Sequence, residues 1–276
     1  MTKVSERLNR LAESATLAMA RMSRELQAKG INIIALSLGE PDFDTPEFIK
    51  EAAKKAIDDN FSHYTPVPGL PELRSSISAK FMRDNHLEYT PDQIVVSTGA
   101  KQSLANVCLS LLDPEDEVLL PCPYWVSYAE IIKLAEGVPV EIKSTIDSDF
   151  KITPNQLEAS ITSRTKMIMF SSPCNPSGTV YTKSELEAIA KMLEKYPNIY
   201  IVSDEIYEHI NFTDKHYSIG TISSMKDRTV TVNGVSKGFA MTGWRVGFIG
   251  APLWIAKACN KIQGQVTSAT CAIAQK

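Results

Sequence analysis

The segment TVTVNGVSKGFAMTGWRVGFIG, residues 229–250, shows most clearly what kind of fold to expect. It opens with a β-branched run at 229–233 and closes with a second apolar run at 246–249, so two strands are expected around a polar loop. That loop contains one lysine, Lys237, followed by a segment of small and aromatic residues. Short apolar runs without strict alternation are typical of strands that are covered on both faces of a sheet.

Similar runs recur along the chain and alternate with helical patterns. Further strands are expected at 33–36, 94–97, 117–120, 138–142, 166–170 and 199–203, and helices at 46–59, 70–83, 101–112, 124–135 and 183–195. The first thirty residues have an amphipathic pattern that predicts one helix ending at Gly30, and 251–276 predict a helix with a polar break at 264–268. The alternation predicts an α/β fold with a mainly parallel sheet and helices on both faces.

Composition excludes several classes of function. The 276 residues are 43% hydrophobic and 22% charged, as in ordinary globular proteins. A formal net charge of -3, without a basic block, argues against a nucleic-acid partner. Neither a membrane span nor a signal peptide is indicated, and the five cysteines have no CxxC spacing, so we expect a cytoplasmic protein with reduced thiols. The four histidines have no metal-binding spacing, and no metal is expected.

Four polar segments follow expected strands, the place where open α/β sheets bind ligands. In chain order they contain Gly99-Ala100-Lys101, Asn175, Asp204 with Tyr207, and Ser236-Lys237. Gly99 can be a simple tight turn, or it can open a helix whose free N–H groups bind a phosphate.

The charged residues of these segments also have two interpretations. Lys237 is either an exposed loop lysine or a desolvated amine that forms a Schiff base. Asp204 is either a helix N-cap or a buried acid, and Arg245 either forms a surface ion pair or binds an anion.

Together these residue types form the set that holds pyridoxal phosphate (PLP). Seven segments resemble the class I, fold-type I PLP-dependent aminotransferases, especially the bacterial aspartate aminotransferases. These segments are SLGEPDFDTP (37–46), YTPVPGLPELR (64–74), STGAKQSL (97–104), CPYWVSY (122–128), SSPCNPSGTVY (171–181), VSDEIYEH (202–209) and NGVSKGFAMTGWRVGF (233–248). The resemblance implies a large PLP-binding domain at 46–276, built on a mainly parallel seven-stranded sheet sandwiched by helices. Residues 1–45 would form an N-terminal arm and part of an incomplete small domain.

The resemblance also implies a role for each candidate residue. Lys237 would carry the cofactor as a Schiff base and act as general acid and base. Asp204 would pair with the pyridine nitrogen, and Tyr207 and Asn175 would bond the phenolic O3′. Trp125 would stack on the ring. The phosphate would be held by Gly99, Ala100, Lys101, Ser236, Arg245 and, from the neighbouring subunit of a homodimer, Tyr64.

Substrate contacts are implied in the same way. Gly39, Trp125 and Asn175 would lie at the amino acid, and Lys101 would pair with the distal carboxylate of aspartate or glutamate. The implied reaction is transamination between L-aspartate, or glutamate, and a 2-oxo acid such as 2-oxoglutarate. Family members continue beyond residue 276, so we expect a chain truncated at its C-terminus, without the small domain and its substrate-carboxylate arginine.

Four other functions stay open at this stage. Two are enzymes with the same pocket: an aminotransferase of other specificity, for prephenate, aromatic or a broad range of substrates, and a C–S lyase. The third is a PLP-binding regulatory module, which would need a basic helix-turn-helix before the fold. The fourth is an inactive truncated fragment.

Overall fold

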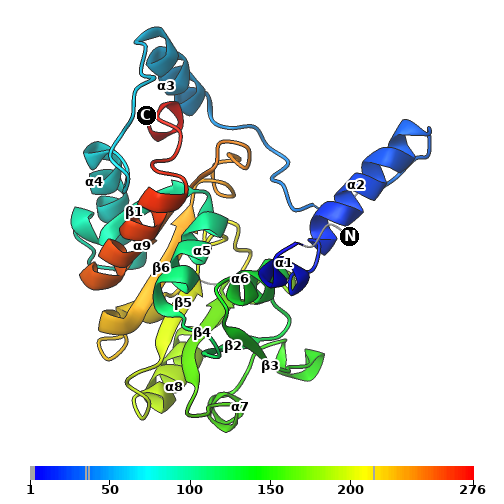
Figure 1. Ribbon diagram of the computed structural model, residues 1–276, viewed down its shortest axis with the longest axis vertical. Coiled ribbons are helices and arrows are strands. Elements are labelled where there is room, and N and C mark those ends of the chain that lie inside the picture. Colours follow the sequence, from blue (N-terminus) through cyan, green and yellow to red (C-terminus); the bar gives the residue numbers. More distant parts are fainter. Residues whose placement is uncertain (1–3, 35, 37, 214) are drawn as a thin grey trace.

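The computed structural model describes residues 4–34, 36, 38–213 and 215–276. A central twisted sheet carries helices on both faces; the first helix, α1 (Glu6–Asn9), lies beside α6 (Ser127–Leu134), and α2 (Ala15–Ala28) extends away from this body (Figure 1). The strands are β1 (Ile94–Thr98), β2 (Glu117–Pro121), β3 (Val138–Ile142), β4 (Thr165–Ser171), β5 (Tyr200–Asp204), β6 (Thr229–Gly234) and β7 (Val246–Gly250).

The sheet has seven strands in the order β1-β7-β6-β5-β4-β2-β3. Strand β7 is antiparallel to both β1 and β6, and the other neighbouring pairs are parallel. The predicted α/β fold with a mainly parallel sheet is therefore confirmed. The predicted strand at 33–36 is wrong for Ile33, Ile34 and Leu36, which lie outside any strand, whereas Ala35 falls outside the described residues. An apolar run becomes a strand only where a sheet edge can pair with its backbone.

The helices are α1 (Glu6–Asn9), α2 (Ala15–Ala28), α3 (Glu47–Asp58), α4 (Pro71–Lys80), α5 (Ala100–Leu111), α6 (Ser127–Leu134), α7 (Pro154–Ala159), α8 (Lys183–Leu193) and α9 (Leu253–Val266). The prediction of a single N-terminal helix is wrong. Ser14 starts a second helix, because its hydroxyl accepts the Leu17 N–H as an N-cap. Gly30, with φ +79°, follows the end of α2 as predicted. The polar break at 264–268 is confirmed, since α9 ends at Val266.

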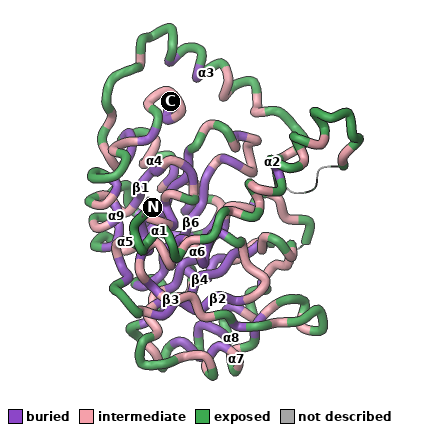
Figure 2. Tube along the Cα trace, turned by 45° about the vertical axis from the view of Figure 1, so that its right-hand side comes forward, coloured by how far each residue is buried: buried purple, intermediate pink, exposed green. Residues whose placement is uncertain are grey.

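Two hydrophobic layers enclose the sheet. Alternate strand residues face opposite layers: Val118 and Leu120 join the cluster under α5, α6 and α9, whereas Leu119 between them joins the cluster under α7 and α8. A third cluster packs Ile77 and Phe81, at the end of α4 and just beyond it, against β1 and β7. The buried residues concentrate in these strands and their covering helices, while α2 and α3 are mostly exposed (Figure 2). Within the described residues, no helix combines the length and apolarity that a membrane crossing requires.

Candidate active site

The topology gathers the candidate residues at one edge of the sheet. Strands β4, β5 and β6 are parallel, so Asn175, Asp204 and Lys237 all follow or end strands at their carboxyl edge. Strand β7 runs in the opposite direction and therefore begins there, which brings Arg245 to the same edge. Strand β1, antiparallel to β7, ends beside it at Thr98, directly before Gly99.

Asp204 ends β5 and is a buried acid, not a helix N-cap. Its side chain is deeply enclosed, and Oδ2 accepts a 2.7 Å hydrogen bond from the Tyr128 hydroxyl. Oδ1 accepts a weaker bond from the Ile206 N–H at 3.3 Å. Burial raises the pKa of Asp204 to about 6, although both hydrogen bonds oppose the shift. A protonated ring nitrogen would find in this carboxylate a preorganised acceptor.

Tyr128 is a further residue of the site for which the motifs predict no role. It lies in the first turn of α6, three residues after Trp125, and is 1% exposed. Its ring meets the Trp125 ring edge-on, with 5.6 Å between centroids. The segment CPYWVSY contains both residues, but only the folded chain shows that the hydroxyl reaches Asp204, 76 positions further along.

Lys237 lies in the loop after β6 and is partly buried. Burial lowers the pKa of its amine, and the nearby Arg245 guanidinium lowers it further, whereas Glu40 opposes the shift. Its Nζ donates to the Gly39 carbonyl oxygen at 2.5 Å and lies 5.5 Å from the centroid of the Tyr207 ring. A lowered pKa increases the neutral fraction of the amine, which is the form that attacks a carbonyl.

Tyr207 and Asn175 are close to one another. The Asn175 side-chain amide donates to the Tyr207 hydroxyl at 3.4 Å, and burial raises the pKa of that phenol, as does the neighbouring Asp204 carboxylate. Both side chains therefore present hydrogen-bonding groups beside Lys237, as a phenolic oxygen on a bound ring requires.

Gly99 and Arg245 form a cradle of N–H donors at the start of α5. Gly99 has φ +81°, and a Cβ placed on it would lie 2.1 Å from Arg245 Nη2. The guanidinium therefore lies directly over the glycine backbone, beside the free N–H groups of the helix N-terminus. Its Nη1 donates to the Thr242 carbonyl oxygen at 2.7 Å, and the buried Ser236 precedes Lys237. This donor set fits a phosphate.

The remaining candidates lie nearer the surface. Lys101 Nζ stands 4.7 Å from the centroid of the Trp125 ring. No atom lies within 4 Å of a Cβ built on Gly39, so open space adjoins that backbone. Tyr64 is 99% exposed, and the single chain does not bring it into the site. The loops that follow β1, β4, β5 and β6 do meet at one sheet edge, whereas the roles of the individual residues stay predictions.

A buried carboxylate, an amine of lowered pKa and the Gly99–Arg245 cradle thus lie at one edge of the sheet in a protein with the fold-type I architecture. A family model described as "Aminotransferase class I and II" matches residues 31–276. The chain belongs to this family and is an aminotransferase, and PLP is the cofactor that the family implies. The resemblance inferred from the motifs is thereby confirmed.

Individual relatives agree with this assignment. The chain is 47% identical over 277 aligned residues to the "Aspartate/prephenate aminotransferase" of Cereibacter sphaeroides, covering all of this chain and 69% of the relative. It is 48% identical, with the same coverage, to the "Probable aspartate/prephenate aminotransferase" of Rickettsia typhi. The solved structure of aspartate aminotransferase from Thermus thermophilus with maleate superimposes with a TM-score of 0.96 at 42% identity, over all of this chain and 71% of that one.

Proposed function

We propose that this protein transfers the amino group of L-aspartate or L-glutamate to a 2-oxo acid such as 2-oxoglutarate, with PLP bound at Lys237. The observation that carries the proposal is the convergence of Lys237, Asp204 and the Gly99–Arg245 cradle at one sheet edge. The names of the relatives support aspartate as donor over a C–S lyase or a regulatory module. They also make prephenate a second candidate acceptor.

Each residue contributes a defined part of the chemistry. Bound PLP supplies an electron sink for the electrons released at the substrate Cα. Lys237 Nζ anchors the cofactor and then moves a proton to and from that Cα. Asp204 holds a proton at the ring nitrogen, while Tyr207 and Asn175 bond the phenolic oxygen. Arg245, Ser236 and the N-terminus formed by Gly99, Ala100 and Lys101 hold the phosphate.

Substrate selection is proposed to depend on the exposed rim of the site. Lys101, held over Trp125, offers a cation to the distal carboxylate of a dicarboxylic amino acid. Trp125 also forms a ring platform, and Gly39 and Asn175 border the space for the α-carboxylate. The similar aspartate aminotransferase structure from Thermus thermophilus is a structure with maleate, a dicarboxylate, which supports a site for two carboxylates.

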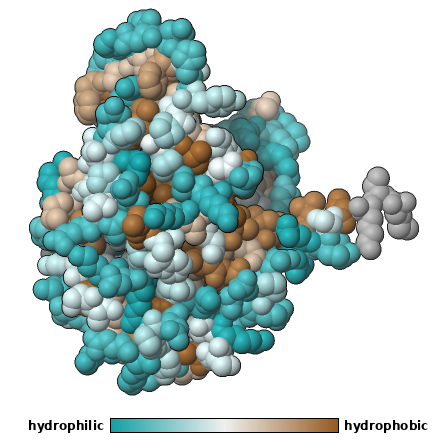
Figure 3. Space-filling model, turned by 60° about the vertical axis from the view of Figure 1, so that its left-hand side comes forward, coloured by the Kyte–Doolittle hydropathy of each residue, from teal (hydrophilic) through white to brown (hydrophobic). Residues whose placement is uncertain are grey.

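We further propose a homodimer in which Tyr64 completes the partner's phosphate site. The described N-terminal third exposes many apolar side chains, and a partner subunit could cover them. They include Leu17, Met19, Met22, Ile34, Leu36, Phe48 and Ile57. Brown apolar groups also reach the surface in Figure 3. The proposed domains are a cofactor-binding body at 46–276 and an arm at 1–45. The free cysteines support a reducing, cytoplasmic location.

The test is the visible spectrum of the purified chain mixed with PLP, followed by titration with L-aspartate. We expect a visible band that forms on Lys237 and disappears as aspartate is added, and no such band in Lys237→Ala. Lys215→Ala, in an exposed loop, is the matched control. A band that persists in Lys237→Ala would overturn the cofactor assignment. The transaminase proposal would be overturned if the Lys237-dependent band forms but does not change when aspartate or glutamate is added, and if no amino group is transferred to prephenate.

A mixing experiment tests the shared site. Tyr64→Phe and Lys237→Ala chains are each expected to be impaired, and a hybrid dimer would contain one site with both wild-type residues. Mixing under exchange conditions should therefore raise the activity above the sum of the separate variants. No gain, although sedimentation shows that hybrids form, would contradict a role for Tyr64 across the interface.

A further inference from the structure

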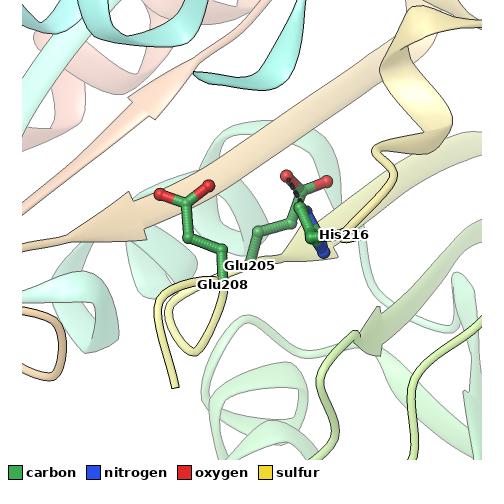
Figure 4. A group of neighbouring side chains, drawn as sticks. All are labelled: Glu205, Glu208 and His216. Atoms are coloured by element: carbon green, nitrogen blue, oxygen red, sulfur yellow. Dashed lines mark hydrogen bonds and ion pairs between the residues drawn. The ribbon is translucent and has the colours of Figure 1, made fainter. Parts of the chain in front are cut away.

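The turn that carries Asp204 and Tyr207 has a second, buried side. Two carboxylates lie there: Glu205 directly follows Asp204, and Glu208 directly follows Tyr207. Glu205 is 0% exposed and Glu208 is 9% exposed. Adjacent residues of an extended chain point to opposite faces, so Glu205 lies behind Asp204. Figure 4 shows these two carboxylates with His216 and the hydrogen bond that joins His216 to Glu205. The proposed chemistry uses none of the three.

Glu208 joins three separate elements of the fold. Its Oε1 pairs with Lys80 Nζ, at the end of α4, and accepts from the Asn233 amide of β6 at 2.9 Å. Its Oε2 accepts from the Asn85 amide in the turn beyond α4. Asn233 lies four residues before Lys237, so one carboxylate connects the turn of Tyr207 with the strand that leads to Lys237. Burial raises the pKa of Glu208, but the Lys80 charge and the hydrogen bonds outweigh it and lower the pKa overall.

Glu205 is held in a similar way. Its Oε1 accepts from the Ser203 hydroxyl at 2.9 Å, and its Oε2 lies 2.9 Å from His216 Nε2. Burial lowers the pKa of His216, but the Glu205 charge outweighs this effect and raises it overall. Glu208 is therefore paired with the Lys80 ammonium, and Glu205 with the His216 ring, behind the turn. Removing either partner of such a pair leaves an uncompensated charge in the interior.

These residues do not suit a metal ion. The ligand atoms of Glu205, Glu208 and His216 lie within 4.8 Å of one another, a spacing that a cation could use. However, both Glu208 oxygens and both Glu205 oxygens accept from N–H or O–H donors, and the Lys80 ammonium would repel an added cation. The carboxylate oxygens that a cation would need are therefore already used by these donors.

We propose that Glu208, with Lys80 as its counter-ion, is a positioning residue that sets Tyr207 and Lys237 against the cofactor, while Glu205 with His216 does the same for Asp204. Glu208 contacts neither of the side chains that it positions. It acts through the backbone of the 204–208 turn, whose Glu208 N–H bonds the Glu205 carbonyl at 3.0 Å, and through β6. The part of this inference that concerns PLP rests on the proposed function. The part that concerns the conformation of the turn does not, because the turn has this geometry without PLP.

The test compares Glu208→Gln, Lys80→Met and the double variant, which removes both charges of the Lys80–Glu208 pair. In the chain without PLP, amide hydrogen exchange at Tyr207 and Glu208 should be about tenfold faster in each single variant and should recover in the double variant. In the loaded chain, PLP should bind about tenfold more weakly in the single variants, and the pH at which its visible band titrates should move.

Glu88→Gln is the matched control, because it breaks an exposed 2.7 Å pair with Lys226. It should leave every readout unchanged. Single variants that lower the unfolding midpoint but keep wild-type exchange at the turn and wild-type PLP binding would show a merely structural pair and overturn the proposal. If the wild-type chain binds no PLP at Lys237, the proposed function fails, and the exchange data still decide whether Glu208 positions the turn.

Discussion

The Tyr128 hydroxyl donates a 2.7 Å hydrogen bond to Asp204 Oδ2, joining the first turn of α6 to the end of β5. Both residues are buried, at 1% and 4% exposure. A neutral donor of this kind steadies the carboxylate without cancelling its charge. The hydrogen bond favours the charged carboxylate, although burial raises the pKa of Asp204 to about 6 overall. We expect Tyr128 to position this carboxylate toward a bound ring nitrogen.

Tyr128→Phe should raise the pKa of Asp204 further, because burial stays and a hydrogen bond to the charged form is lost. The cost of losing one such bond to a charged group, on the order of 2 kcal/mol, predicts PLP binding weaker by roughly tenfold or more. Infrared titration of the protonated carboxyl in the cofactor-free chain would measure the pKa. Tyr124→Phe, whose hydroxyl bonds the exposed Glu141 at 2.7 Å, is the control. The same Asp204 pKa in Tyr128→Phe and Tyr124→Phe would refute the role of Tyr128.

Asp204 should also make the stability of the cofactor-free chain depend on pH. Burial raises its pKa from 3.8 to about 6, so between these values the folded chain binds more protons at this site than the unfolded chain. The contribution of Asp204 to the free energy of unfolding therefore falls as the pH rises through that window, by on the order of 3 kcal/mol. Urea unfolding of Asp204→Asn should lack this component. Parallel stability curves for the two chains would contradict it.

Gly99→Ala should weaken cofactor binding and stability together. A φ of +81° with ψ 159° is strained for alanine, at about 1–3 kcal/mol, and the new Cβ would displace the Arg245 guanidinium. Gly30→Ala has a similar φ of +79° but open space around its Cβ, so it carries only backbone strain. Calorimetric titration should therefore show weaker PLP binding by Gly99→Ala than by Gly30→Ala. Equal PLP affinity in Gly99→Ala and Gly30→Ala would argue against the cradle.

Lys101→Met should alter substrate preference and leave cofactor chemistry largely intact. Loss of one charge-assisted contact to the distal carboxylate, about 1.5–3 kcal/mol, predicts a fall in kcat/KM for aspartate of roughly 10- to 100-fold. Turnover of alanine, which has no distal carboxylate, should change little. Steady-state rates with both donors provide the comparison. A parallel loss for both donors would indicate that Lys101 serves the phosphate instead.

The strands and their ligand-bearing loops could be predicted from local pattern. Short apolar runs at β1 to β7 each carry enough β-branched and buried character to mark a strand, and the polar residues after them, such as Asp204 and Lys237, mark the binding edge. Ile33 and Ile34 have the same local character and form no strand. The hydrophobic pattern indicates which segments can be buried. Whether such a segment forms a strand depends on a neighbouring strand that can pair with its backbone, and the local sequence does not identify that neighbour.

By itself, then, the sequence determined the α/β class, the family and the residue types of the site, because these depend on periodicity and on motifs a few residues long. Tertiary structure alone decided that Tyr128 reaches Asp204, that Lys80 meets Glu208 across 128 positions, and that the reversed direction of β7 brings Arg245 to Gly99. Such contacts depend on strand order and helix docking, which many weak interactions set together.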